Sequence, residues 1–155
     1  MKKAIVLLIA SLAAISGVAC GGSDSGDSEA PIVRKDDFVK RSEAICTRNR
    51  KEQEKALLEG IEDGKEFVKA QGEGDKAATA EVVTKPLFKK IDTMIDELAS
   101  VGLPKGSEAS AEKMIVHFEN ALRAAEGSPV KFLTRGVFED AEAAARAAGL
   151  KHCTM

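Results

Sequence analysis

Apolar residues recur every three or four positions along most of this chain, which is the spacing of a helix that buries one face. The clearest series predicts a helix from about residue 80 to 101, with its inward positions at Ala80, Val83, Leu87, Ile91, Met94, Leu98 and Val101. A second series predicts a helix over 111–125, with His117 at its edge and with inward positions at Ala111, Met114, Ile115, Phe118, Ala121, Leu122 and Ala125.

Weaker series predict one helix on each side of this pair. The earlier one begins near Asp36 and Asp37, acids suited to a helix N-terminus, and runs beyond residue 58. Gly60 and Gly64 predict a break or bend before residue 67. The later helix begins at Pro129 and ends at Gly149, and its inward positions are Val130, Leu133, Val137, Ala141, Ala144 and Ala148.

Glycine- and proline-rich segments at 71–74, 102–106 and 127–129 separate these four helices. Pro86 lies inside the second helix, where it predicts a kink or a restart, because proline lacks the backbone donor and disfavours helix before it. Short connections favour antiparallel neighbours. We therefore predict an all-α fold, a four-helix antiparallel bundle with up-down-up-down topology, stapled by one disulfide.

The N-terminus has the features of a secretory signal. Lys2 and Lys3 precede an uncharged apolar run of 16 residues, 4–19, which is shorter than the roughly 20 residues of a membrane-spanning helix. The run ends in Ser16-Gly17-Val18-Ala19-Cys20, followed by Gly21-Gly22-Ser23. The sequence thus predicts a signal peptide at 1–19.

The segment that ends at Cys20 resembles the lipobox of bacterial lipoproteins, although Gly17 stands where that family most often has Leu. The resemblance implies that Cys20 is lipidated and becomes the first residue of the mature protein. Membrane attachment would then be through lipid alone, and two or three acyl chains hold a protein durably to a bilayer. Two other interpretations are cleavage after Ala19 by ordinary signal peptidase, which leaves a secreted protein with a spare thiol, and an uncleaved anchor.

Residues 20–35 are predicted to be a lipid-anchored flexible linker, and residues 36–155 the helical domain. The segment 21–30 contains Gly, Ser, Asp and Glu and no apolar residue larger than Ala. The linker either lets the domain reach partners or wall polymer, or only keeps the lipidation site accessible.

The two remaining cysteines, Cys46 and Cys153, form an even pair in a chain addressed to an oxidising compartment. We predict a Cys46–Cys153 disulfide, which also agrees with the bundle topology, because the last helix returns to the start of the first. The alternatives are two free thiols or a metal site built with His152 or His117. The usual metal-ligand spacing is absent, so no metal ligand is predicted.

The stretch 47–55 contains no apolar residue. It leaves Asn49 and Gln53 on the inward stripe of the first helix. One hypothesis is a polar groove for an anionic ligand, lined by Arg48, Asn49, Arg50 and Gln53. The alternative is a solvated helix face, because Glu52 and Glu54 alternate with the bases.

Composition narrows the function classes. The chain has 155 residues, of which 31% are charged and 44% hydrophobic, enough for one core and incompatible with disorder throughout. A net charge of -2 and six aromatic residues, all Phe, do not favour nucleic-acid binding, aromatic cages or strands.

Several short motifs resemble small exported lipoproteins of high-GC Gram-positive bacteria. They are Asp37-Phe38, Ala44-Ile45-Cys46, Pro86, Leu103-Pro104 and the closing Ala148–Cys153, together with the lipobox. This resemblance implies the cysteine pairing and the helical fold, and no activity.

The residues contain no phosphate-binding loop, nucleophile elbow or zinc-protease motif, so we predict neither an enzyme nor a cofactor. The predicted function is an exported, lipid-anchored cell-envelope protein, an interaction or structural module whose partner is an envelope protein or wall polymer. The alternative is a ligand-binding or substrate-capture lipoprotein with a pocket between helices, near Pro86 or the 47–55 stretch. A third hypothesis is an enzyme or metal-dependent factor.

Overall fold

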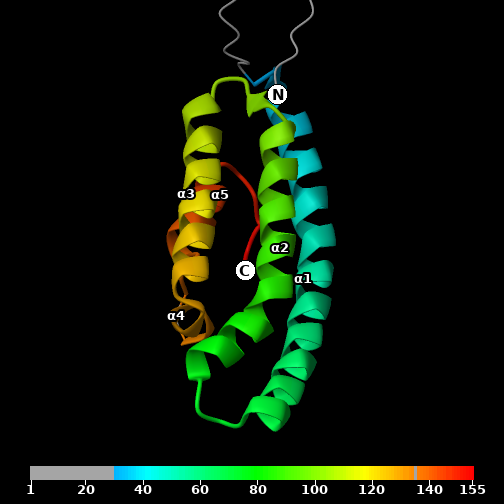
Figure 1. The fold of residues 1–155 in the computed structure, drawn as a ribbon. Coiled ribbons are helices and arrows are strands. Elements are labelled where there is room, and N and C mark those ends of the chain that lie inside the picture. The colour runs from blue at the N-terminus through cyan, green and yellow to red at the C-terminus, as the bar shows by residue number, and fades with distance from the viewer. Residues whose placement is uncertain (1–29, 135) are drawn as a thin grey trace, which may run out of the picture.

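The computed structural model describes residues 30–134 and 136–155, and within them it contains five helices and two short strands (Figure 1). The all-α class is confirmed. In chain order the elements are β1 (Ile32–Val33), α1 (Lys35–Gln71), α2 (Lys76–Ser100), β2 (Leu103–Pro104), α3 (Glu108–Gly127), α4 (Pro129–Thr134) and α5 (Glu139–Ala147). Residues 1–29, and with them Cys20, the signal peptide and most of the linker, lie outside the described residues.

The first helix is continuous, so the break predicted at its glycines is wrong. α1 runs through Gly60 and Gly64, and both are buried against α2. A Cβ atom on Gly60 would lie 2.0 Å from the carbonyl oxygen of Val83. These glycines therefore allow two helix backbones to approach closely, and the packing that results outweighs the low helix propensity of glycine.

α2 continues through Pro86 and does not restart there. Asp75 caps its N-terminus by accepting a hydrogen bond from the backbone N–H of Ala78 (2.9 Å). Figure 1 shows that the first turns of α2 are inclined to the rest, as expected where proline removes a backbone hydrogen bond. The predicted inward positions of α2 are buried, except Val83, which is half-buried.

The predicted fourth helix is instead two short helices, α4 and α5, so the four-helix up-down-up-down topology is not confirmed. Gly136 lies in the connection between them, where its low helix propensity favours a break. Val130 and Leu133, predicted to face inward, are 43% and 48% exposed. Aromatic rings supply the packing here. Phe132 stacks edge-on to Phe88 at 5.0 Å between ring centroids, and Phe138 lies 6.2 Å from Phe132.

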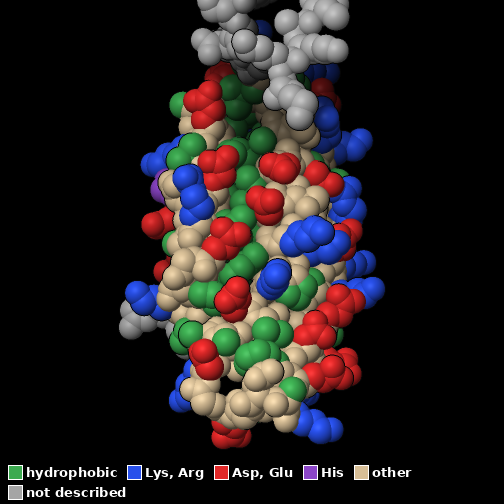
Figure 2. Space-filling view, in the orientation of Figure 1, with side chains coloured by type: hydrophobic (Ala, Val, Ile, Leu, Met, Phe, Trp, Pro, Cys, Tyr) green, Lys and Arg blue, Asp and Glu red, His purple; other side chains and the backbone are tan. Residues whose placement is uncertain are grey.

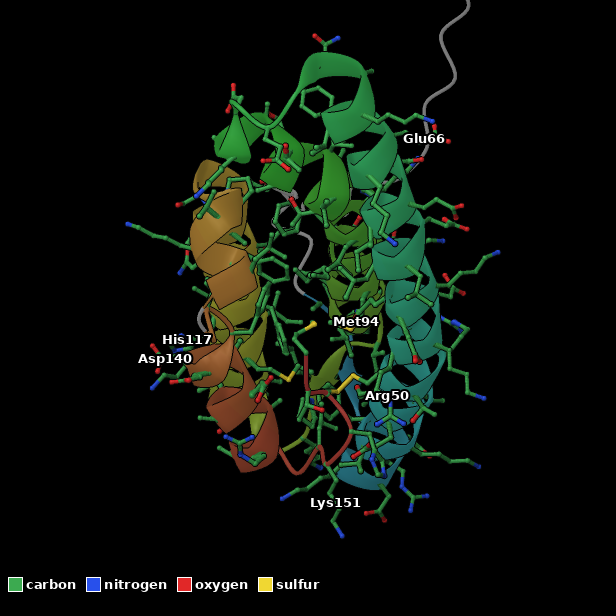
Figure 3. All side chains as sticks on the ribbon, turned by 90° about the horizontal axis from the view of Figure 1, so that it is seen from below. Arg50, Glu66, Met94, His117, Asp140 and Lys151 are labelled. Carbon is green, nitrogen blue, oxygen red and sulfur yellow. A yellow bond between two sulfur atoms is a disulfide. The ribbon has the colours of Figure 1, made fainter. Side chains whose placement is uncertain are left out.

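The core lies between α1, α2, α3 and α5, and its largest fully buried side chains are Phe38, Ile91, Met94, Leu98, Met114 and Phe118. Met94 is seen among the side chains between the helices in Figure 3. His117 is half-buried at the edge of this core, as its position predicted.

The folded domain begins earlier than predicted. Residues 31–34 were assigned to the linker, but β1 pairs in parallel with β2, Ile32 opposite Leu103 and Val33 opposite Pro104. The backbone N–H of Leu103 donates to the carbonyl of Pro31 (2.8 Å). Gly102 makes this pairing possible, because its φ is +96° and a Cβ there would lie 2.3 Å from the same carbonyl oxygen. The strand pair fixes the N-terminal end of the domain to the α2–α3 connection.

Candidate functional site

A disulfide joins the first helix to the C-terminal tail, as predicted. Cys46 on α1 and Cys153 are bonded with their Cα atoms 5.0 Å apart, and both side chains are buried. Neither cysteine is therefore a free thiol or a metal ligand in this structure. Within residues 30–134 and 136–155, no group of three His, Cys, Asp or Glu side chains is placed to hold a metal ion.

Two carboxylates hold the same tail by its backbone. Glu43 on α1 accepts hydrogen bonds from the backbone N–H groups of Lys151 and His152. Glu142 on α5 accepts one from the N–H of Met155 (2.8 Å). Glu43 was not predicted, because its partners lie more than 100 residues away in the sequence and carry no distinctive side chain. The tail is thus held to α1 before the disulfide bond and to α5 after it.

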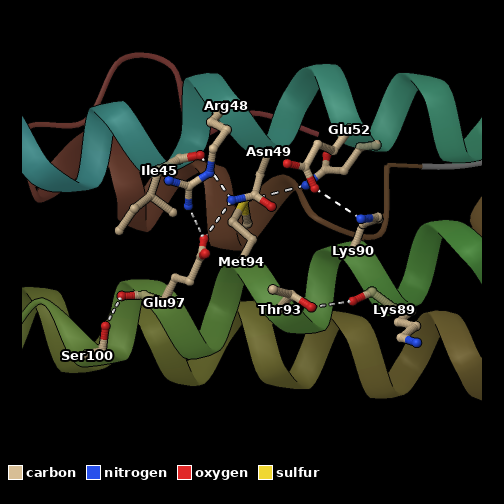
Figure 4. Close-up of polar contacts among 11 residues, drawn as sticks. Ile45, Arg48, Asn49, Glu52, Lys89, Lys90, Thr93, Met94, Glu97 and Ser100 are labelled. Carbon is tan, nitrogen blue, oxygen red and sulfur yellow. Dashed lines mark hydrogen bonds and ion pairs between the residues drawn. The ribbon is translucent and has the colours of Figure 1, made fainter.

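The polar stretch of α1 turns its amides inward, as predicted. Asn49 is 2% exposed and Gln53 is 7% exposed. The Asn49 Nδ2 group donates to the Glu97 carboxylate on α2 (2.8 Å) and to the carbonyl of Ile45 (3.1 Å) (Figure 4). Gln53 donates to the sulfur of Met94 (3.5 Å). These contacts satisfy the buried donors, which would otherwise cost free energy.

The predicted ligand-binding residues are only partly brought together. Arg48 forms an ion pair with the same Glu97 carboxylate that Asn49 contacts, whereas Arg50 is exposed and is not part of this cluster. An added anion would have to compete with Glu97 for these donors. Together with the Lys90–Glu52 ion pair (3.0 Å), the cluster therefore accounts for helix packing and register between α1 and α2 better than for anion binding.

A groove of about 1100 Å³ lies beside the proline of α2, one of the two places where the alternative function expects a pocket. Its lining residues belong to the distal end of the domain, meaning the end that holds the α1–α2 turn, the start of α2 and α4 in Figure 1, opposite residue 30. Its walls come from α1, α2 and the α3–α4 corner. Apolar lining residues include Val82, Pro86, Phe88 and Pro129.

The rim of this groove is acidic. Asp63, Asp75, Glu81, Asp92 and Glu126 line it, against two lysines, Lys85 and Lys89. Asp75 is the cap of α2. In the described part of the chain, the other four carboxylates have no ion pair or hydrogen bond, in contrast to carboxylates such as Glu52 and Glu97 in the α1–α2 seam. Figure 2 shows acidic side chains on both sides of the hydrophobic ones along one face of the molecule.

Large apolar side chains are also exposed at the distal end. Leu58 is 62% exposed and Ile61 is 37% exposed, both on α1, and Val130 and Leu133 are exposed on α4. Ile61 borders a shallow hollow in the α1–α2 seam that Val68 and Val83 also line. Lone exposed apolar residues are common on protein surfaces, whereas clustered ones mark interaction surfaces.

Comparisons with protein-family models, with curated proteins and with solved structures find no match for this chain. None of the helices in the described ranges combines the length and the apolar character that crossing a bilayer requires.

Proposed function

We propose that this protein is an exported, lipid-anchored envelope protein whose helical domain is an interaction module that meets its partner with the distal end. The anchor follows from the resemblance of Ser16–Cys20 to a lipobox. Because residue 30 lies at the opposite end of the domain, a linker attached there would leave the distal end farthest from the attachment point. An interaction surface at that end is the one most accessible to another envelope protein.

The observation that carries this proposal is the exposed apolar surface of α1 near its C-terminal end. Leu58 and Ile61 are exposed and Val68 is half-buried, and their spacing of three and seven residues puts them on one face of the helix. α1 packs on α2, and in Figure 1 its distal half has no other helix beside it. Burial of one Leu or Ile side chain contributes about 1.5–3 kcal/mol. This apolar surface favours a protein partner over a wall polymer.

Charge substitution on this surface should abolish the interaction. In L58E/I61E the partner would have to bury two carboxylates, so proximity labelling from the domain in intact cells should lose its specific products. V116E is the matched control, because Val116 is an exposed apolar residue on α3, 50% exposed and away from the distal end of α1. Equal labelling by wild type and L58E/I61E would contradict the proposed surface.

The anchor has a separate test. Replacement of Cys20 with Ala removes the thiol that would be acylated, and each buried methylene of an acyl chain contributes about 0.8 kcal/mol to membrane binding. We expect C20A to leave the membrane fraction, as measured by fractionation and immunoblotting. Retention of C20A in membranes would exclude attachment through lipid on Cys20.

A receptor for a small ligand is the second candidate, and the groove beside Pro86 is the observation that favours it. Small-molecule sites have volumes of about 300–1,000 Å³ and combine apolar walls with a few polar groups. The groove has apolar walls, but it is larger than this range and its rim is charged.

A further inference from the structure

We propose that the groove beside Pro86 binds an extended or helical polypeptide segment of the partner that carries Lys or Arg next to apolar side chains. This inference rests on the proposed function and names the chemistry of the partner. The groove is defined by Val82, Pro86 and Phe88 on its floor, by the carboxylates Asp63, Glu81, Asp92 and Glu126 on its rim, and by Pro129 at the α3–α4 corner.

The shape of the groove suits a chain segment. In Figure 1 the first turns of α2 are inclined to the rest of the helix, and the groove is lined by α2 residues from Ala77 to Asp92, on both sides of Pro86 in the sequence. A length of about 1.5 Å per helical residue makes this wall more than 20 Å long. A small molecule would contact only part of such a wall, whereas a helical segment of about four turns, at about 5.4 Å per turn, would contact all of it.

The charge of the groove selects a basic segment. Its lining has five carboxylates and two lysines, a net charge of about -3 when all are ionised. Four of these carboxylates have no cation partner in the described part of the chain, so no described side chain of the protein neutralises their charge. A groove of one sign of charge with apolar walls concentrates ligands of the opposite sign.

The carboxylates lie on three elements. Asp63 is on α1, Glu81 and Asp92 are on α2, and Glu126 is at the end of α3. Basic side chains on either edge of a bound segment would therefore each find a carboxylate, while the apolar side chains between them contact Val82 and Phe88. Lys85 and Lys89 would set the orientation of the bound segment, because they repel its basic groups from the middle of the groove edge that α2 forms.

The test uses the full chain, purified in a non-ionic detergent, and two fluorescent peptides of defined composition. One is an amphipathic peptide of Lys, Leu and Ala, and the other has Glu at every Lys position. Fluorescence anisotropy measures binding, with empty micelles as the blank. We expect the Lys peptide to bind at least about tenfold more tightly than the Glu peptide, a difference of about 1.4 kcal/mol.

A charge-matched pair of variants locates the site. D92K/E126K reverses two carboxylates of the groove, and D96K/E112K reverses two exposed carboxylates on the same helices outside it. We expect D92K/E126K to weaken binding of the Lys peptide at least about tenfold, and D96K/E112K to change it less than about twofold. Equal weakening by both variants would overturn the inference, because binding would then follow net charge alone.

The outcomes separate this inference from the proposed function. If the Lys peptide does not bind, while L58E/I61E still removes the labelled partner, the groove inference fails and the proposed function stands. If the peptide binds as expected, but labelling is the same without the domain, the groove does bind basic segments and the proposed function fails. Tight binding of the Glu peptide would overturn the charge argument directly.

Discussion

Removal of the Cys46–Cys153 disulfide should lower the free energy of unfolding by up to about 4.7 kcal/mol, the figure of the chain-entropy model for a loop of about 100 residues. The two cysteines are separated by 107 positions, so the bond closes a loop that contains nearly all of the helical domain. Urea unfolding of C46S/C153S, followed by far-UV circular dichroism, measures the loss. Because domains of this size are stable by only about 5–15 kcal/mol, a loss of about 4.7 kcal/mol would be about a third or more of the total stability.

The reductant provides the control for this experiment. Reduction of the wild-type chain should reproduce the loss seen for C46S/C153S, and reductant should not destabilise the variant further. Cys153 is not the only attachment of the tail, because Glu43 also holds the backbone at Lys151 and His152. Equal stability of the oxidised wild type and the variant would show that these cysteines are not bonded in the mature protein.

Replacement of Gly60 with Ala should destabilise the protein by about 2 kcal/mol, although alanine is the better helix former. The added Cβ would lie 2.0 Å from the carbonyl oxygen of Val83 and 3.2 Å from Cγ of Pro86, so α1 must move away from α2. Overpacking in a close contact costs about 1–3 kcal/mol or more, which outweighs the gain of about 1 kcal/mol in helix propensity. The same unfolding measurement determines the difference.

Gly127 is the matched control for this substitution. It is the last residue of α3, and nothing lies within 4 Å of a Cβ built on it. G127A should therefore be neutral or slightly stabilising. If G60A were as stable as G127A, the close approach of α1 and α2 in the structure would be incorrect.

The parts of the fold that the sequence predicts are those that depend on local periodicity. The inward stripe of α3 was predicted from spacing alone, and it is buried apart from Ile115, which is half-buried. The prediction that Val130 and Leu133 face inward is wrong for a physical reason. Gly136, Val137 and Phe138 are not helical. Phe132 and Phe138 pack with Phe88 and Phe118, an arrangement that brings together residues far apart in the sequence.

The role of a glycine within a helix is also not determined by the local sequence pattern. A glycine inside a helix pattern predicts a break on propensity, yet Gly60 and Gly64 are sites where a second helix comes close. Nothing near them in the sequence identifies Val83 as the contact. Long-range packing, absent from a local pattern, decides which of the two roles a glycine has.

The candidate site was predictable only in part. The inward position of Asn49 and Gln53 follows from helix periodicity, but their partners Glu97 and Met94 lie more than 40 residues away. A pocket near Pro86 belongs only to the alternative function that the sequence leaves open. Its acidic rim was not predicted, because Asp63, Asp92 and Glu126 are far apart in the chain and meet only through the packing of α1, α2 and α3.

We propose above all that the helical domain brings the anchored protein to an envelope partner. Proximity labelling at the membrane tests this interaction most directly. The full chain is compared with a chain that keeps the anchor and linker but lacks residues 36–155. We predict that a small, reproducible set of envelope proteins is labelled only by the full chain, and that L58E/I61E loses the same set. Identical labelling by the two chains would contradict the claim, and would favour the small-ligand receptor.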